Sequence, residues 1–232
     1  MATVKGALSL ALALGAALVL AGCGNVLFDA DFEADLEGLH PSSNPAGRPT
    51  GDMIRVWIDD PGNLIVTGRG ISGKSLLYRY TGTLSQVDFI GTEMSRNPPE
   101  YWAMWNGRTE QFTEGTPRLA FSIGNFNVGR AGLEIVHGEF AASGRVLGDV
   151  VPGEDHTIVV HVDSMEGTYT VSIFQRGGGV VDFGPMPLTS RGLVPGDSAF
   201  DISMFFDVLP AADTGRYLID NILITEERPE LP

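Results

Sequence analysis

Hydrophobic and polar residues alternate with a period of two in several short segments of this chain. In residues 118–123, every second residue is leucine, phenylalanine or isoleucine. The same alternation occurs in residues 157–162 and 168–173. A period of two places successive side chains on opposite faces of a β-strand. We therefore expect strands here, the last two paired as an antiparallel hairpin across residues 163–167.

Further segments have the composition of strands and are bounded by turn residues. They are residues 53–58, 63–67, 75–80, 84–90, 101–105, 132–137, 199–206 and 216–224. The 30 glycines and 14 prolines are spread along the chain, and no segment has a capped, amphipathic helical pattern. The pattern predicts an all-β fold, an antiparallel β-sandwich of the jelly-roll kind.

The most regular alternation runs from Phe28 to Glu37. One face of this expected strand is apolar, and the other carries the carboxylates of Asp29, Asp31, Glu33, Asp35 and Glu37. Like charges on one strand face repel one another and destabilise the strand. We expect full solvation, a basic neighbour or a bound cation to offset this repulsion.

The N-terminal segment has the form of a signal peptide. Lys5 precedes an apolar run from Ala7 to Leu20, which is shorter than the roughly 20 residues that span a bilayer. The run ends in Leu20-Ala21-Gly22-Cys23, which resembles the lipobox of bacterial lipoproteins. The resemblance implies that Cys23 receives diacylglycerol, that the chain is cut before it, and that the new amino terminus is acylated. The alternatives are an ordinary secretory signal with a chance cysteine, or an uncleaved anchor.

On this interpretation residues 1–22 are the signal peptide and residues 23–232 form one β-sandwich domain. Cys23 is the only cysteine, so the mature protein would have no disulfide and no free thiol for catalysis. Gly24 and Asn25 follow it, without the aspartate that resembles an inner-membrane retention signal. By that analogy we expect lipid attachment to the outer membrane, with the domain beginning almost at the anchor.

The net charge of the chain limits the classes of partner that it can bind. The net charge is −14, and loss of Lys5 with the signal peptide would take it to −15. Such a chain repels phosphate backbones, which argues against nucleic-acid binding. Divalent cations and cationic partners remain compatible with this charge.

Three further segments are Asp31-Phe32-Glu33, residues 72–76 and residues 217–222. Together they resemble bacterial jelly-roll domains of the concanavalin A-like lectin/glucanase and carbohydrate-binding-module folds. The resemblance implies that the first and last strands lie side by side, and that acids from both hold a structural Ca²⁺. Asp220 also shares a strand face with apolar residues, and a buried carboxylate needs a partner. Two interpretations stay open: a Ca²⁺ bound by some of Asp29, Asp31, Glu33 and Asp220, or a solvated acidic face with Asp220 bonded to backbone.

Residues 68–75 match the glycine-rich phosphate-binding loop of nucleoside triphosphatases. That loop needs a following helix, whose amino terminus binds phosphate. Residues 76–82 instead have the composition of a strand. We therefore interpret residues 68–75 as a turn and expect no nucleotide.

The segment Glu33-Ala34-Asp35-Leu36-Glu37 resembles the Glu-x-Asp-x-Glu signature of family 16 glycoside hydrolases. In that family the two glutamates are nucleophile and acid/base, as retaining hydrolysis requires. Here Ala34 replaces a branched aliphatic residue, and the segment opens the domain instead of lying on a central strand. No histidines have zinc-ligand spacing, and no serine lies in a nucleophile elbow.

The aromatic residues of segment 101–106 are candidates for sugar stacking. In a strand, Trp105 shares one face with Tyr101 and Ala103, while Trp102 lies on the other face with Met104. Trp102 and Trp105 are the carbohydrate-binding candidates because flat aromatic rings pack against the apolar faces of sugars. The alternative is that most of this set packs in the core.

These features favour a non-enzymatic envelope lipoprotein whose domain binds a glycan or a partner protein. One alternative is a polysaccharide hydrolase or lyase of the concanavalin A-like fold. A third is a purely structural lipoprotein.

Overall fold

The computed structural model describes residues 26–39, 64–80, 86–92, 98–111, 118–125, 129–136, 138–175, 181–189, 202–209 and 215–230. Within these ranges the regular elements are all β-strands. No helix in the described part of the chain has the length and apolar character needed to cross a bilayer. The expected signal peptide, Cys23 and the expected strand at 53–58 lie outside the described residues.

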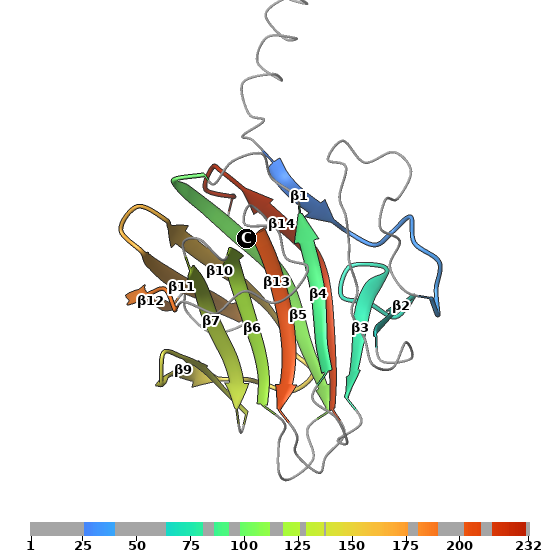
Figure 1. Cartoon of the computed structure of the whole chain (residues 1–232). Helices are drawn as coiled ribbons and strands as arrows, with labels where there is room; N and C mark the ends of the chain where they lie inside the picture. The colour runs from blue at the N-terminus through green and yellow to red at the C-terminus, as the bar shows by residue number, and fades with distance from the viewer. Residues whose placement is uncertain are drawn as a thin grey trace, which may run out of the picture.

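The strands form two antiparallel sheets that face each other (Figure 1). The large sheet has the order β12-β11-β10-β5-β14-β3-β2, and β1 also pairs with β14. Its strands are β1 (Val26–Ala30), β2 (Leu64–Thr67), β3 (Ser75–Tyr80), β5 (Glu100–Gln111), β10 (Asp155–Asp163), β11 (Thr168–Gln175), β12 (Val181–Pro187) and β14 (Gly215–Thr225).

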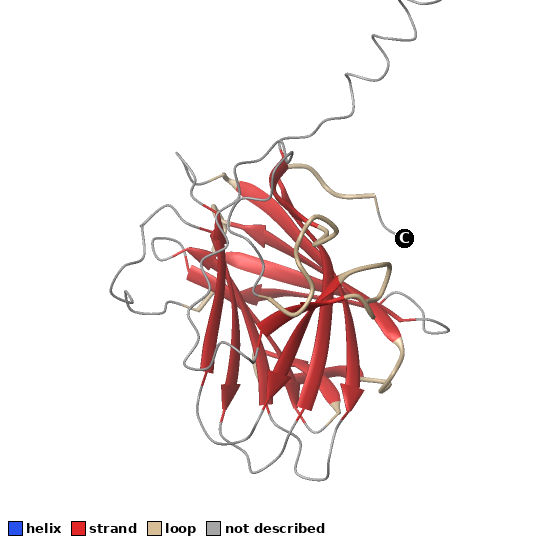
Figure 2. Ribbon diagram, turned by 90° about the vertical axis from the view of Figure 1, so that its right-hand side faces the viewer, coloured by secondary structure: helices blue, strands red, loops and turns tan. Residues whose placement is uncertain are grey.

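The small sheet has the order β4-β13-β6-β7-β8-β9. Its strands are β4 (Gln86–Thr92), β6 (Arg118–Asn125), β7 (Gly129–Val136), β8 (Glu139–Ala142), β9 (Arg145–Asp149) and β13 (Ile202–Leu209). The all-β antiparallel sandwich expected from the alternation is thereby confirmed (Figure 2).

The core fills the space between the two sheets. In strand β5 every second side chain points into the core: Tyr101, Ala103 and Trp105 are buried, whereas Trp102 and Met104 are partly exposed. Side chains that point inward from one sheet meet those of the other, as in other β-sandwiches. The large buried rings and aliphatic chains of the core include Phe28, Trp105, Phe121, Leu133, Phe140, Ile158, Val171 and Ile219.

Most expected strands are present, with ends shifted by a few residues. The hairpin is confirmed, since β10 and β11 pair with Asp163 opposite Thr168. Strands β8, β9 and β12 were not expected from the sequence. Strand β12 contains Pro185 and Pro187, which favour a turn, but it is the edge strand of its sheet. An edge strand tolerates proline because its outer backbone groups need no strand partner.

The expectation for the first strand is wrong beyond Ala30. Strand β1 ends there, and Phe32 has a φ of 60°, outside the extended region. Asp35 is 3% exposed, whereas Leu36 is 69% exposed, which reverses the expected faces. The carboxylates of residues 29–37 therefore do not form one row along a strand.

The reason is a contact with the turn between β2 and β3. The Lys74 ammonium donates hydrogen bonds to the carbonyl oxygens of Glu33 (3.0 Å) and Asp35 (2.8 Å). The two bonds hold the segment after β1, which forms turns in place of a continued strand. The first and last strands do lie side by side as expected, with Ala30 opposite Ile222.

Candidate functional site

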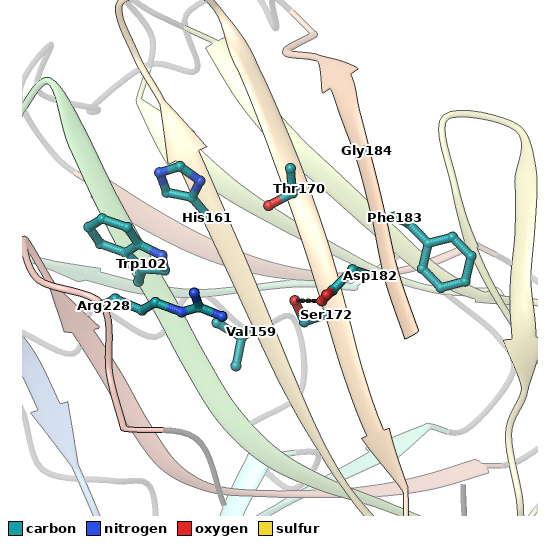
Figure 3. A pocket seen from close by; sticks show the side chains of 9 residues that line it. All are labelled: Trp102, Val159, His161, Thr170, Ser172, Asp182, Phe183, Gly184 and Arg228. Atoms are coloured by element: carbon teal, nitrogen blue, oxygen red, sulfur yellow. Dashed lines mark hydrogen bonds between the residues drawn. The ribbon is translucent and has the colours of Figure 1, made fainter. Parts of the chain in front are cut away.

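A pocket of about 390 Å³ lies on the outer face of the large sheet, away from the core. Four neighbouring strands, β5, β10, β11 and β12, form its floor, and the segment after β14 forms one wall (Figure 3). We call it the outer-face pocket. It is lined by Trp102, Val159, His161, Thr170, Ser172, Asp182, Phe183, Gly184 and Arg228.

The most distinctive feature of the outer-face pocket is a stacked pair of rings. Trp102 of β5 lies directly opposite His161 of β10 in the antiparallel register. Their ring centroids are 4.4 Å apart and the ring planes differ by 13°. The Glu100 carboxylate lies beside the pair, with its Oε2 3.8 Å from His161 Nε2. Trp102 faces outward because the alternate residues of β5 fill the core.

Polar side chains of β11 and β12 line the opposite side of the pocket. The Ser172 hydroxyl donates a 2.5 Å hydrogen bond to Asp182 Oδ1. Thr170 lies two residues from Ser172 on the same face. Strand β12 approaches β11 closely here, since a Cβ on Gly184 would come within 2.9 Å of Thr170 Cγ2. Glycine at this position therefore allows β12 to approach β11, with Asp182 beside Ser172.

Trp105, the second expected carbohydrate-binding tryptophan, is not on a surface. Its side chain is 0% exposed and packs 5.4 Å from the ring of Phe121. Core packing, the alternative for this set, holds for Trp105, which therefore offers no ring to a ligand. For Trp102 the structure leaves an accessible side chain in a pocket, and its role in binding stays a prediction.

Trp105 belongs to a buried polar cluster with His156 and Tyr217. The Tyr217 hydroxyl lies 2.7 Å from His156 Nε2 and 3.4 Å from Trp105 Nε1. Burial lowers the pKa of His156 to about 4, although nearby Asp155 partly opposes the shift. Burial also raises the pKa of Tyr217 above its ordinary range. Neither group lines the outer-face pocket, so we assign this cluster to stability.

Two of the four expected calcium ligands contact the same turn. Asp220 is buried, and its Oδ2 accepts hydrogen bonds from the Ser72 backbone N–H (3.1 Å) and hydroxyl (2.8 Å). Its Oδ1 accepts a bond from the Asn221 N–H at 2.9 Å. Glu33 Oε1 accepts a 2.7 Å bond from the Lys74 N–H. Asp220 thus fixes the β2–β3 turn to β14, and Glu33 fixes it to the segment that follows β1.

The other two expected ligands lie on or just after β1. Asp29 is opposite Leu223 of β14 and is exposed. Asp31 Oδ1 accepts a 3.0 Å bond from the Glu33 N–H, which shapes the first turn after the strand. Among the residues that the structure describes, no three acidic, histidine or cysteine side chains form a group suited to a metal. The Ca²⁺ assignment stays a prediction.

The two sequence motifs with catalytic counterparts meet at the β2–β3 turn. Residues 68–75 are followed by strand β3 and not by a helix, as expected for a turn. A Cβ on Gly73 would overlap the Glu33 carboxylate, and one on Gly68 would overlap that of Glu37. The Glu-x-Asp-x-Glu segment therefore lies against this turn, and none of its residues lines the outer-face pocket.

Sequence reasoning missed most of the pocket. The alternation puts Thr170 and Ser172 on the polar face of residues 168–173 and His161 on the outer face of residues 157–162, but it assigns no role to any of them. Asp182 lies on β12, which the prolines concealed. The alternation does place Trp102, His161 and Thr170 on the faces opposite the apolar positions of their strands. The register that brings them together was not readable from the pattern.

No protein-family model matches the sequence, and no curated protein matches it. Solved structures do share its fold. The catalytic domain of a glycoside hydrolase family 131 protein from Coprinopsis cinerea matches with a TM-score of 0.59 and 10% identity, over 89% of this chain and 96% of that one. A family 131 β-glucanase catalytic domain from Podospora anserina matches with a TM-score of 0.57 and 11% identity, over 90% and 98%.

A sialidase matches with a TM-score of 0.55 and 13% identity over 87% of this chain, which spans 18% of the sialidase's length. At these identities the likeness concerns the arrangement of strands and not the residues of any site. The chain therefore has a jelly-roll β-sandwich fold, which supports the resemblance of its end segments to concanavalin A-like domains.

Proposed function

We propose that this protein is an envelope lipoprotein, held by lipid on Cys23, whose domain binds a glycan in the outer-face pocket without cleaving it. The observation that carries the proposal is the stacked pair of Trp102 and His161, partly exposed on a sheet face. Exposed aromatic rings beside hydrogen-bonding groups match the two chemical aspects of a sugar, its apolar C–H face and its hydroxyls.

The stacking prepares the rings for binding. A tryptophan alone on a sheet surface loses side-chain freedom when a ligand orders it, which reduces affinity. Here His161 already covers one face of Trp102, so a sugar meets a ring whose orientation is fixed. Thr170, Ser172 and Asp182 then supply donors and acceptors across β11 and β12.

The fold supports a glycan as the ligand class. Two solved domains with this arrangement of strands are glycoside hydrolase domains, and one is named a β-glucanase. The likeness concerns the arrangement of strands in the two sheets, and the outer-face pocket lies on one of these sheets. Since the identities are 10% and 11%, the choice of Trp102 and its neighbours rests on the pocket alone.

The number of carboxylates that line the outer-face pocket favours binding over hydrolysis. Glycosidases generally use two carboxyl groups, spaced for attack and protonation. Among the described residues that line the outer-face pocket, Asp182 is the one carboxylate, and it already accepts the Ser172 hydroxyl. The Glu33–Glu37 segment contacts the β2–β3 turn instead.

The test is a glycan array probed with full-length protein in detergent, followed by calorimetric titration of the best binders. Trp102→Ala should weaken binding about tenfold or more, since central aromatic contacts contribute the largest share of binding energy. Val146→Ala, an exposed apolar residue on the small sheet, is the control and should bind as wild type.

Three results would contradict the proposal. Binding of no glycan at all would remove the ligand class. Equal affinity of Trp102→Ala and wild type would remove the pocket. Release of reducing ends from a bound oligosaccharide would show the hydrolase alternative to be correct.

A further inference from the structure

We infer that the outer-face pocket selects a glycan that carries a carboxylate or sulfate group, which binds the Arg228 guanidinium. The inference rests on the proposed function and names the class of glycan. It comes from the charged groups that line the pocket and from the way the last segment of the chain is folded over the sheet.

The position of Arg228 is set by the end of β14. Thr225, the last residue of that strand, lies directly opposite Trp102 of β5. Its Oγ1 accepts a 3.2 Å hydrogen bond from the Glu227 N–H, which bends the chain after the strand. The bend brings Arg228 back over the sheet, where its side chain extends past Trp102 towards Val159 (Figure 3).

Arg228 is available to a ligand. Arg108, on the same face of β5 as Trp102, is by contrast held by Asp155, with its Nε 2.6 Å from Oδ1. Arg228 makes no ion pair or hydrogen bond with any residue that the structure describes. Asp182 lines the same pocket but is bonded to Ser172 instead. The five N–H donors of an unpaired guanidinium fit a carboxylate or sulfate in a bidentate manner.

The acidic residues around Arg228 and the negative net charge of the chain favour a ligand that carries few negative charges. Glu226, Glu227 and Glu230 flank Arg228 in sequence, and the whole chain has a net charge of −14. This field repels a dense polyanion at long range. A single acidic group on a sugar ring is repelled much less than a polyanion, and its direct contact with Arg228 offsets that repulsion. Asp182, at the β12 side, suits sugar hydroxyls, which donate to it.

The experiment compares matched neutral and acidic glycans on full-length protein in detergent. The probes are 3′-sialyllactose against lactose, trigalacturonate against its methyl ester, and the sulfated and neutral members of a glycan array. The variants are Arg228→Gln, which removes the charge, and Arg228→Lys, which keeps it without the planar fork. Arg145→Gln is the control, because it removes one exposed positive charge from β9 of the other sheet.

We expect acidic glycans to bind more tightly than their neutral partners. Arg228→Gln should reduce affinity for the acidic glycan at least about tenfold and leave neutral glycans unchanged, as expected for loss of a charge-assisted hydrogen bond. Arg228→Lys should give an intermediate loss, and Arg145→Gln should bind as wild type.

The outcomes separate this inference from the proposed function. Binding of neutral glycans that depends on Trp102 but not on Arg228 would overturn the inference and leave the function intact. Acidic glycans bound equally by wild type and Arg228→Gln would also overturn it. If no glycan of either kind binds, the proposed function fails and the inference fails with it.

Discussion

His156 shows how strongly a single buried side chain responds to its surroundings. It lies in the core at 2% exposure, against Phe140 and Tyr217, and its Nε2 is 2.7 Å from the Tyr217 hydroxyl. Desolvation disfavours the charged imidazolium, so the pKa falls to about 4. In the unfolded chain an ordinary histidine titrates near pH 6.5.

This difference makes folding sensitive to acid. Between about pH 6.5 and pH 4 the unfolded chain binds a proton that folded His156 does not, so stability falls as the pH falls through this window. The loss attributable to His156 is roughly 3 kcal/mol, from 1.36 kcal/mol for each pKa unit. An NMR titration of the His156 imidazole should show a midpoint near pH 4 in the folded protein. A midpoint at the ordinary value would contradict the buried assignment.

At the residue scale, the alternation of the sequence was enough to separate Trp102 from Trp105. It could not reveal the His156–Tyr217 pair, because these residues are 61 positions apart and meet only through the sheet. Nor could it explain Gly107, where a Cβ would overlap the Tyr217 hydroxyl and come within 2.5 Å of His156 Nε2. Such space requirements arise from packing and leave no mark on the local pattern.

At the scale of elements, the join between the β2–β3 turn and β14 depends on one carboxylate. Strand β14 pairs with β3 along Gly215–Ile219 and with β1 along Ile222–Thr225, and Asp220 lies between these two pairings. Ser72 supplies two donors to that carboxylate. The β2–β3 turn thus bonds to β14 at the point where β14 changes its pairing from β3 to β1.

Ser72→Ala removes the hydroxyl donor and keeps the backbone donor. Since hydrogen bonds to charged groups contribute about 1.5–3 kcal/mol, we expect a loss of this order in the free energy of unfolding, measured in urea. Ser164→Ala, in the β10–β11 turn, removes a hydroxyl that has no hydrogen-bond partner among the described residues, and should change stability by less than about 0.5 kcal/mol. Equal effects of the two substitutions would show that the Ser72–Asp220 bond is unimportant.

The first strand shows where sequence reasoning ends at this scale. Residues 28–37 alternate without interruption, yet the strand stops at Ala30 because Lys74, some 40 positions away, bonds to the backbone of the next residues. By contrast β10 and β11 are joined by a four-residue turn, residues 164–167, and the pattern located both strands and their pairing. Local pairing is readable from alternation, whereas long-range contacts compete with it.

At the scale of the molecule, the outer-face pocket lies near the expected anchor. Val26, the first residue of β1, is opposite Thr225, which is opposite Trp102, which is opposite His161. Adjacent strands are about 4.8 Å apart, so Trp102 is roughly 10 Å from Val26 across the sheet. Three residues of chain reach roughly 10 Å further, so a lipid on Cys23 would hold the pocket near the membrane surface.

The anchor itself is tested by Cys23→Ser. Without the thiol no diacylglycerol can be attached, so the protein should move from the membrane to the soluble fraction. Intact-mass spectrometry of the wild type should show a chain that begins at Cys23 and carries acyl groups. A wild-type chain of unmodified mass would contradict the lipoprotein assignment while leaving the pocket unaffected.

The most direct test of the proposed function is the position of a bound sugar, determined by crystallography with the best glycan from the array. We expect a sugar ring packed against Trp102 and His161 on the outer face of the large sheet, with its hydroxyls near Ser172 and Asp182. A sugar bound elsewhere, such as on the small sheet or at the β2–β3 turn, would contradict the central claim.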